Sequence, residues 1–205
     1  MSAAGRRPIV TVAAEHGAAG DVVAARVADA LGVPFLDRAL PASLAAASEE
    51  SERPSGVVGS LARASTIFAG EPVERLDLDE GQMRADLAEF LARTSTDGGV
   101  ILGRGGMLVL ADAPRALHVL LTGDRQGRVE RVAEREGIDS EEADRRVRVH
   151  DRARREYVRR AFGVDPDDRA LYHLIVDTVA LGVEASIELV LTASRARTRQ
   201  PPTAS

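Results

Sequence analysis

IVTVAAEHGAAGDVVAARVADAL, residues 9–31, contains the pattern from which the fold of this 205-residue chain can be predicted. A short apolar run, Ile9 to Ala14, leads through a loop bounded by Gly17 and Gly20 into a segment with helical periodicity. In that segment apolar residues recur every fourth position, so one helix face points to a core. A strand, a glycine loop and a helix in this order aim backbone N–H groups and a helix N-terminus at an anion, usually a phosphate.

The loop departs from the usual phosphate-loop pattern, G-x-x-x-x-G-K-[ST]. Gly20 fits the last glycine, but Glu15 stands at the first glycine, Asp21 at the lysine and Val22 at the hydroxyl residue. The chain has no lysine that could substitute from elsewhere. A carboxylate in the first helical turn suits the helix dipole but repels a phosphate. Two interpretations remain open, a phosphate loop or a tight turn in which Asp21 caps its own helix.

Composition sets limits on the class of protein. The chain is 44% hydrophobic, which suffices for one substantial core, and it has no cysteine for disulfides or thiolate metal sites. Its four histidines show no metal-ligand spacing, so we predict no metal site on the protein. The apolar run after Arg6-Arg7 is broken by Glu15 and His16, and no run is long enough to span a bilayer. We therefore expect a cytoplasmic protein without a membrane partner.

Every one of the 27 basic residues is arginine, and the formal net charge is −5. Residues 145–160 contain eight arginines and two acids. Such a run is either a solvated helix face or a lid whose guanidinium groups neutralise a polyanion. The negative net charge and the presence of only six aromatic residues argue against a protein that binds nucleic acid.

Apolar patterning along the rest of the chain predicts alternating strands and helices. Strands are expected at residues 9–14, 33–37, 100–102, 116–122 and 174–177, and helices after 20 and over about 80–95, 124–136, 141–162 and 183–191. This alternation predicts an α/β fold with a doubly wound parallel sheet, whose ligands bind at the carboxyl ends of the strands. Polar residues stand at those ends: Asp37-Arg38, Arg104, Gly123-Asp124 and Asp177.

Three arginines near these ends are candidate anion ligands. Arg104 lies between glycines just past a strand, where a phosphate could approach the bare backbone, although a turn arginine paired with an acid is equally consistent. Arg128 and Arg131 share one face of the helix that follows residues 116–122.

Four segments in this order resemble the cytidylate kinase-like branch of the P-loop nucleoside monophosphate kinases, over about residues 8–192. Residues 9–38 resemble the opening strand, glycine loop, helix and strand, and VILGRGG (residues 100–106) resembles the VxxGR segment. Residues 128–160 resemble the lid, with Asp151, Arg154 and Tyr157 at matching spacing. LIVDTVALGVEASIELV resembles the last strand and helix, with Asp177-Thr178 in place.

The resemblance implies a three-layer P-loop kinase-like fold with a five-stranded parallel sheet of order 2-3-1-4-5 and an Arg-rich helical lid. Residues 1–193 would form one domain, with an acceptor-binding excursion at 39–79 and the lid at 137–165. Residues 194–205 are polar, contain Pro201-Pro202 and are expected to be a disordered tail.

The resemblance also implies an activity, the transfer of a phosphoryl group from ATP to a nucleoside monophosphate, with CMP as first candidate. The nucleotides would be the partners. Arg131, Arg154 and Asp151 would be catalytic, with Arg128 and Arg148 stabilising the transferred group. Asp37, Arg38 and Arg104 would bind the acceptor. The phosphates of ATP would lie on Gly17, Ala18, Ala19, Gly20, Asp21 and Val22.

Several positions depart from the family pattern. Leu102 and Gly105 replace the aspartates that flank the Gly-Arg pair in cytidylate kinases proper, and Val147 replaces an arginine, although Arg148 is adjacent. Without a hydroxyl at Val22, the sequence offers no clear protein ligand for Mg²⁺. The alternative is a catalytically impaired, nucleotide-binding relative with a regulatory or partner-binding role.

Overall fold

The structure, a computed structural model, describes residues 7–36, 98–103 and 105–199. Its centre is a five-stranded parallel sheet in the order β2-β3-β1-β4-β5. The strands are β1 (Ile9–Ala14), β2 (Phe35–Leu36), β3 (Gly99–Leu102), β4 (Ala116–Thr122) and β5 (Leu174–Asp177). The expected strand order is confirmed. β1 lies in the middle, with Val10 opposite Val100 of β3 and Leu117 of β4, so the loop after β1 opens at the centre of the sheet edge.

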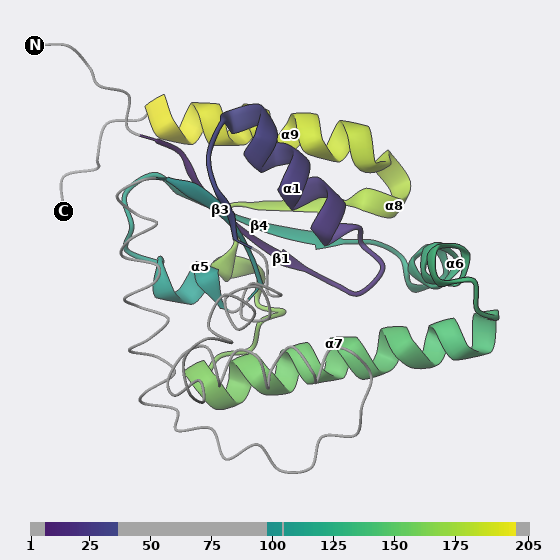
Figure 1. Cartoon of the computed structure of the whole chain (residues 1–205). Coiled ribbons are helices and arrows are strands. Elements are labelled where there is room, and N and C mark those ends of the chain that lie inside the picture. The colour runs from purple at the N-terminus through teal and green to yellow at the C-terminus, as the bar shows by residue number, and fades with distance from the viewer. Residues whose placement is uncertain (1–6, 37–97, 104, 200–205) are drawn as a thin grey trace, which may run out of the picture.

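Helices cover both faces of the sheet, which gives three layers (Figure 1). α1 (Gly20–Leu31) and α9 (Val183–Arg199) lie together on one face. α5 (Gly106–Val109) and α7 (Ser140–Phe162) lie on the other. The main core lies between the sheet and the first pair, because the apolar face predicted for residues 20–31 packs there through Val23 and Val27.

α6 (Arg125–Glu136) stands at the end of the sheet where the loop opens. The side chains of Asp124 and Asp139 cap α6 and α7 by accepting from backbone amides three residues on. The two helices share a small apolar cluster built on Val132 and Val147. Two short elements, the 3₁₀-helix η1 (Arg169–Leu171) and α8 (Thr178–Leu181), flank β5.

The C-terminal helix corrects one sequence-based expectation. α9 continues to Arg199, so residues 194–199, expected in a disordered tail, are helical. Ser194 is 1% exposed, and the Arg197 side chain donates to the carbonyl of Ala116 (3.3 Å). The last part of α9 is therefore packed against the start of β4, which polar composition alone did not indicate.

Several predictions lie outside the described residues: the excursion at 39–79, the helix at 80–95, and the side chains of Asp37, Arg38 and Arg104. Among the helices of the described part, none combines the length and apolar character that a membrane crossing requires.

Candidate active site

The loop between β1 and α1 is folded tightly against α6. Gly17 has φ +85°, and a Cβ placed on it would meet the carbonyl oxygen of Arg128 at 2.6 Å. Ala19 also adopts the left-handed conformation (φ 53°, ψ 33°), which is uncommon for a residue with a Cβ. These two left-handed residues turn the chain sharply into α1. Strained backbone of this kind is concentrated at functional sites.

The first turn of α1 has no side-chain cap among the described residues. Asp21 instead accepts a hydrogen bond from Nη1 of Arg135 on α6, at 3.0 Å, so the interpretation that it caps its own helix is wrong. The uncapped amides of the first turn carry the positive end of the helix dipole. The loop therefore keeps the feature with which helix N-termini bind phosphates.

Arg128 is buried behind the loop. Its Nη1 donates to the carbonyl of His16 (2.9 Å) and to Oδ2 of Asp151 (2.8 Å), and its Nε donates to the carbonyl of Gly123 (3.1 Å). The Glu15 carboxylate lies 3.4 Å from Nε. Arg128 therefore ties the loop to α6 and α7, as a structural clamp whose Nε and Nη1 are already engaged.

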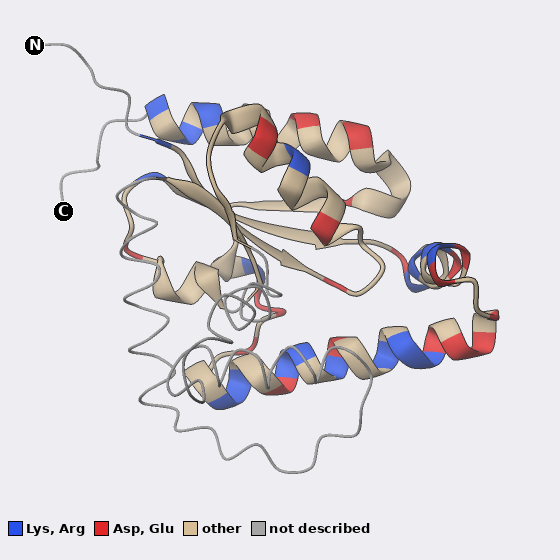
Figure 2. Ribbon diagram, viewed as in Figure 1, with Lys and Arg blue, Asp and Glu red and all other residues tan. Residues whose placement is uncertain are grey.

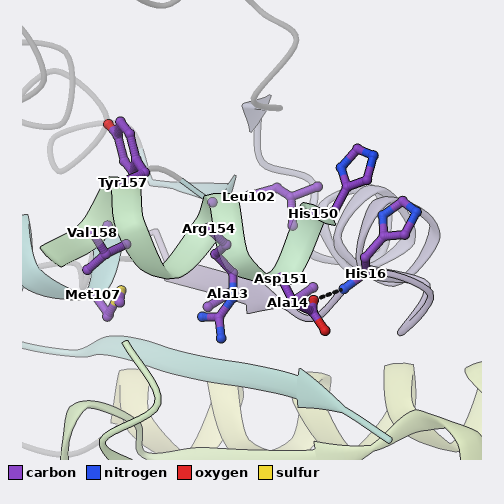
Figure 3. A pocket seen from close by; sticks show the side chains of 12 residues that line it. Ala13, Ala14, His16, Leu102, Met107, His150, Asp151, Arg154, Tyr157 and Val158 are labelled. Atoms are coloured by element: carbon purple, nitrogen blue, oxygen red, sulfur yellow. Dashed lines mark hydrogen bonds between the residues drawn. The ribbon is translucent and has the colours of Figure 1, made fainter. Parts of the chain in front are cut away.

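Asp151 of α7 completes this clamp from the other side. Its Oδ1 accepts from the backbone amide of His16 at 2.9 Å, and its residue exposure is 7% (Figure 3). A loop amide and a guanidinium group are the donors that would hold a phosphate oxygen. Here an internal carboxylate takes these two donors, which fixes α7 to the loop.

Arg131 holds the loop from the adjacent turn of α6. Its Nη1 donates to the Gly17 carbonyl (3.1 Å) and to the hydroxyl of Thr178 (3.1 Å), and its Nη2 donates to the Thr178 carbonyl (3.0 Å). Thr178 is fully buried at the end of β5, and its hydroxyl donates to the carbonyl of Ala18 at 3.0 Å. Arg131 and Thr178 together fix the carbonyls of Gly17 and Ala18 in the loop.

A pocket opens beside the loop at the carboxyl ends of β1 and β3, beneath α7 (Figure 3). Its lining is Ala13, Ala14, His16, Leu102, Gly103, Gly105, Met107, His150, Asp151, Arg154, Tyr157 and Val158. Arg154 points from α7 toward β1, and one of its Nη groups donates to Asp167. Its Nε and other Nη are buried and form no hydrogen bond of good geometry within the described residues, although the guanidinium lies near the Tyr172 hydroxyl, whose pKa is raised by burial and lowered in part by this guanidinium. A buried guanidinium with unused donors can bind an anionic ligand at low desolvation cost.

Arg148 does not join this group. It is half-exposed on α7 and pairs with Asp144 at 3.2 Å, and it does not line the pocket. Charged residues of both signs alternate along α6 and α7 (Figure 2). Six of the twelve arginines there pair with acids of the same two helices, and three more pair with Asp165 or Asp167 just beyond α7. The Arg-rich run is thus largely a salt-bridged helix face, and Arg154 is the pocket-facing exception among its described residues.

One ion-pair network joins the two helices near the loop. Arg146 of α7 pairs with Glu136 of α6 (2.6 Å) and with Glu142 (2.9 Å). Hydrogen bonds from Arg145 and Arg146 lower the pKa of Glu142 to about 2. Partial burial raises the pKa of Glu136, but Arg146 and Arg135 outweigh it and lower the pKa overall. Both carboxylates therefore stay charged at neutral pH and hold α7 on α6.

The residues near the loop do not fit a Mg²⁺ site. Val22 offers no oxygen, and the Glu15 carboxylate already accepts from the Thr122 hydroxyl (2.6 Å) beside Arg128. No cluster of three or more His, Asp or Glu side chains suited to a metal occurs in the described part of the chain.

The sequence did not single out four residues that form the site: Glu15, His16, Arg135 and Thr178. Thr178 stood in the quoted Asp-Thr pair without an assigned role. Arg135 follows Arg131 by one helical turn, a spacing that could have placed it on the same face. Nothing local in the sequence indicates that the amide of His16 meets a carboxylate 135 residues away.

Known proteins similar to this chain include two cytidylate kinases. That of Methanopyrus kandleri is 44% identical over 62 residues, which make up 30% of this chain and 32% of that protein. That of Aeropyrum pernix is 30% identical over 138 residues, 67% of this chain and 75% of that protein. A segment of the uronate isomerase of Corynebacterium glutamicum is 32% identical over 131 residues, 64% of this chain but 23% of that protein. The chain thus spans a third or less of two of these relatives.

Solved structures show the same fold. An uncharacterized protein from Eubacterium ventriosum superposes with a TM-score of 0.70 at 18% identity, covering 93% of this chain and 99% of that one. The sequence pattern of the cytidylate kinase-like family matches residues 9–180, from the first strand through α8. With the sheet order, the glycine loop and the arginines around it, this match shows that the chain belongs to the cytidylate kinase-like family.

Proposed function

We propose that this protein transfers a phosphoryl group from ATP to a nucleoside monophosphate, with CMP as the first candidate acceptor. Membership of the family supports a kinase-like function with ATP as substrate. The observation that carries the proposal is Arg154, whose buried Nε and one Nη form no hydrogen bond of good geometry within the described residues, at a pocket next to the loop. Phosphoryl transfer depends mainly on positioning and on neutralising charge, which is the chemistry that this group offers.

In this proposal each part of the site has a separate task. The amides of Gly17 and residues 19–22 bind the polyphosphate of ATP, while the amide of Ala18 donates to the carbonyl of Glu15 (3.0 Å) within the loop. Arg131 keeps the loop in shape. Arg154 neutralises charge on the transferred group, while Asp151 orients Arg128 against the loop. Asp37, Arg38 and Arg104 remain predicted acceptor ligands outside the described residues. The sequence has no lysine, so the side-chain cations that the protein itself can bring to the phosphates are arginines.

A second candidate function has its own support. Asp151 already takes one loop amide, and Asp21 places a carboxylate where a phosphate loop has its cation. Both features weaken phosphate binding, and the loss of one preorganised donor typically costs about 10²–10³ in kcat. This second candidate is a relative that binds nucleotides without turnover and acts through regulation or a partner.

Product analysis tests the first candidate. Purified protein is incubated with ATP, Mg²⁺ and each common nucleoside monophosphate, and diphosphates are separated by anion exchange. We expect diphosphate from CMP and a loss of at least about tenfold in kcat/KM for Arg154→Gln. Arg159→Gln, which removes an exposed arginine of the same helix, is the matched control and should stay within about twofold. No diphosphate from any acceptor would refute the proposal.

Calorimetric titration with the same nucleotides separates the two candidates. Binding without turnover supports the second, and so does activity that appears or rises in Asp21→Lys, which restores the loop cation. Turnover at the same rate by Asp21→Lys and by the unmodified protein counts against the second candidate.

A further inference from the structure

Three arginines of α6 form one stripe that faces the loop. Arg128, Arg131 and Arg135 follow one another by three and four residues, so they share a helix face. Arg128 reaches the carbonyl of His16 (2.9 Å), Arg131 that of Gly17 (3.1 Å) and Arg135 the carboxylate of Asp21 (3.0 Å). The stripe therefore follows the loop from its start into the first turn of α1.

The three members differ in how many donors they have left. Arg128 is buried and bound to carbonyl and carboxylate oxygens, and Arg131 shares its donors among three acceptors. Arg135 has a side chain 47% exposed, and its partner Asp21 is 42% exposed. Its other contact is with the neighbouring Glu136, at 3.5 Å. Arg135 is thus the member whose guanidinium is open to an incoming ligand.

The pairing with Asp21 changes the charge at the loop. An unpaired carboxylate in the first turn of α1 would repel a polyphosphate, but the bound guanidinium cancels its charge. An arginine has five N–H donors, so the bonds to Asp21 (3.0 Å) and Glu136 (3.5 Å) leave three for phosphate oxygens.

We propose that Arg135, held in place by Asp21, binds the ATP polyphosphate through its remaining guanidinium N–H donors, where other phosphate loops carry a lysine. The inference rests on the proposed function and names a binding residue for it. Asp21 serves in this arrangement as the anchor of Arg135. Donors supplied from α6 thus replace the lysine that other phosphate loops carry in α1.

Titration calorimetry with inorganic tripolyphosphate tests the inference. We expect Arg135→Gln to weaken binding about tenfold and Arg135→Lys to keep most of the affinity, because charge is retained. Arg26→Gln is the matched control. Arg26 lies further along α1, is about as exposed as Arg135, and pairs with one carboxylate, that of Glu184 on α9. Binding by Arg135→Gln within about twofold of the unmodified protein would overturn the inference, as would an equal loss in Arg26→Gln.

A charge swap provides the second arm. Arg135→Asp should abolish measurable binding, and the double variant Asp21→Arg with Arg135→Asp should restore it, because the pair is rebuilt with the cation on α1. Failure of the swap to restore binding in a folded protein, judged by an unchanged Tm, overturns the inference.

Failure of the inference is distinct from failure of the proposed function. If tripolyphosphate binding depends on Arg135 but no diphosphate forms, the role of Arg135 in polyphosphate binding is supported and the kinase proposal is refuted. Diphosphate formation that Arg135→Gln leaves within about twofold in kcat/KM refutes the role of Arg135 and leaves the kinase proposal in place. An unmodified protein that does not bind tripolyphosphate overturns the inference outright.

Discussion

Substitution of Asp151 by asparagine removes the charge that fixes α7 to the loop. The Asp151 side chain is 10% exposed and that of its partner Arg128 is 8% exposed, so both charges are largely out of water. The carboxylate accepts from Nη1 of Arg128 at 2.8 Å and from the amide of His16 at 2.9 Å. The amide group of asparagine has one acceptor oxygen, so only one of these two bonds can persist.

The expected cost follows from this geometry. Removing one partner of a buried ion pair costs about 3–5 kcal/mol, because the other charge is left uncompensated. The asparagine side chain would keep one bond, and Glu15 lies 3.4 Å from Nε of Arg128, so we take the lower end, about 3 kcal/mol. For a chain of this size that free energy corresponds to a fall in Tm of about 6–12 °C.

Urea unfolding followed by circular dichroism measures the change, with Tm as a second readout. Asp144→Asn is the control, since Asp144 lies on the same helix but forms exposed pairs with Arg125 and Arg148. We expect the control to cost less than about 1 kcal/mol. A loss below about 1 kcal/mol for Asp151→Asn, or equal losses for the two variants, would refute the argument that this carboxylate clamps the loop.

Three further predictions test other parts of the structure. Burial lowers the pKa of His118 to about 4, and the neighbouring His173 and Arg197 add to this effect. On acidification the unfolded chain therefore binds a proton at this histidine near pH 6.5, whereas the folded protein does so only near pH 4. Stability should therefore be complete above about pH 6.5 and fall by about 2–3 kcal/mol by about pH 4.5, and urea midpoints should show a smaller fall in His118→Gln. Gly17→Ala should lower the free energy of unfolding by about 2 kcal/mol or more, because the new Cβ is strained and collides with Arg128. Gly137→Ala, at a similar φ but with open space around the Cβ, should cost about 1 kcal/mol. Equal changes in Tm for the two variants would contradict this prediction. Thr178→Val leaves a buried loop carbonyl without its donor and should cost about 1–3 kcal/mol in urea unfolding, and a neutral outcome would show that the hydroxyl does not hold the loop.

Much of the architecture could be predicted from local sequence. Buried parallel strands appear as short apolar runs, which is why residues 116–122 and 174–177 were located at their observed bounds. The amphipathic periods of α6 and α7 located both helices to within a residue or two. The strand order came from family resemblance, and the structure confirms it. The helical part of residues 194–199 was missed because its packing depends on contacts with β4, far away in the sequence.

For the site, composition and motifs showed which residue types were available: a glycine loop, no lysine, an acid at Asp21 and many arginines. Which arginine meets which partner became clear from the packing of the helices. This packing assigns Arg128 to Asp151 and the loop, Arg135 to Asp21, and Arg148 to the exposed surface. The physical reason is that periodicity fixes the face of a helix on which a side chain lies, whereas an ion pair between segments depends on how two helices dock. That docking is a property of the whole core, and no local stretch of the sequence encodes it.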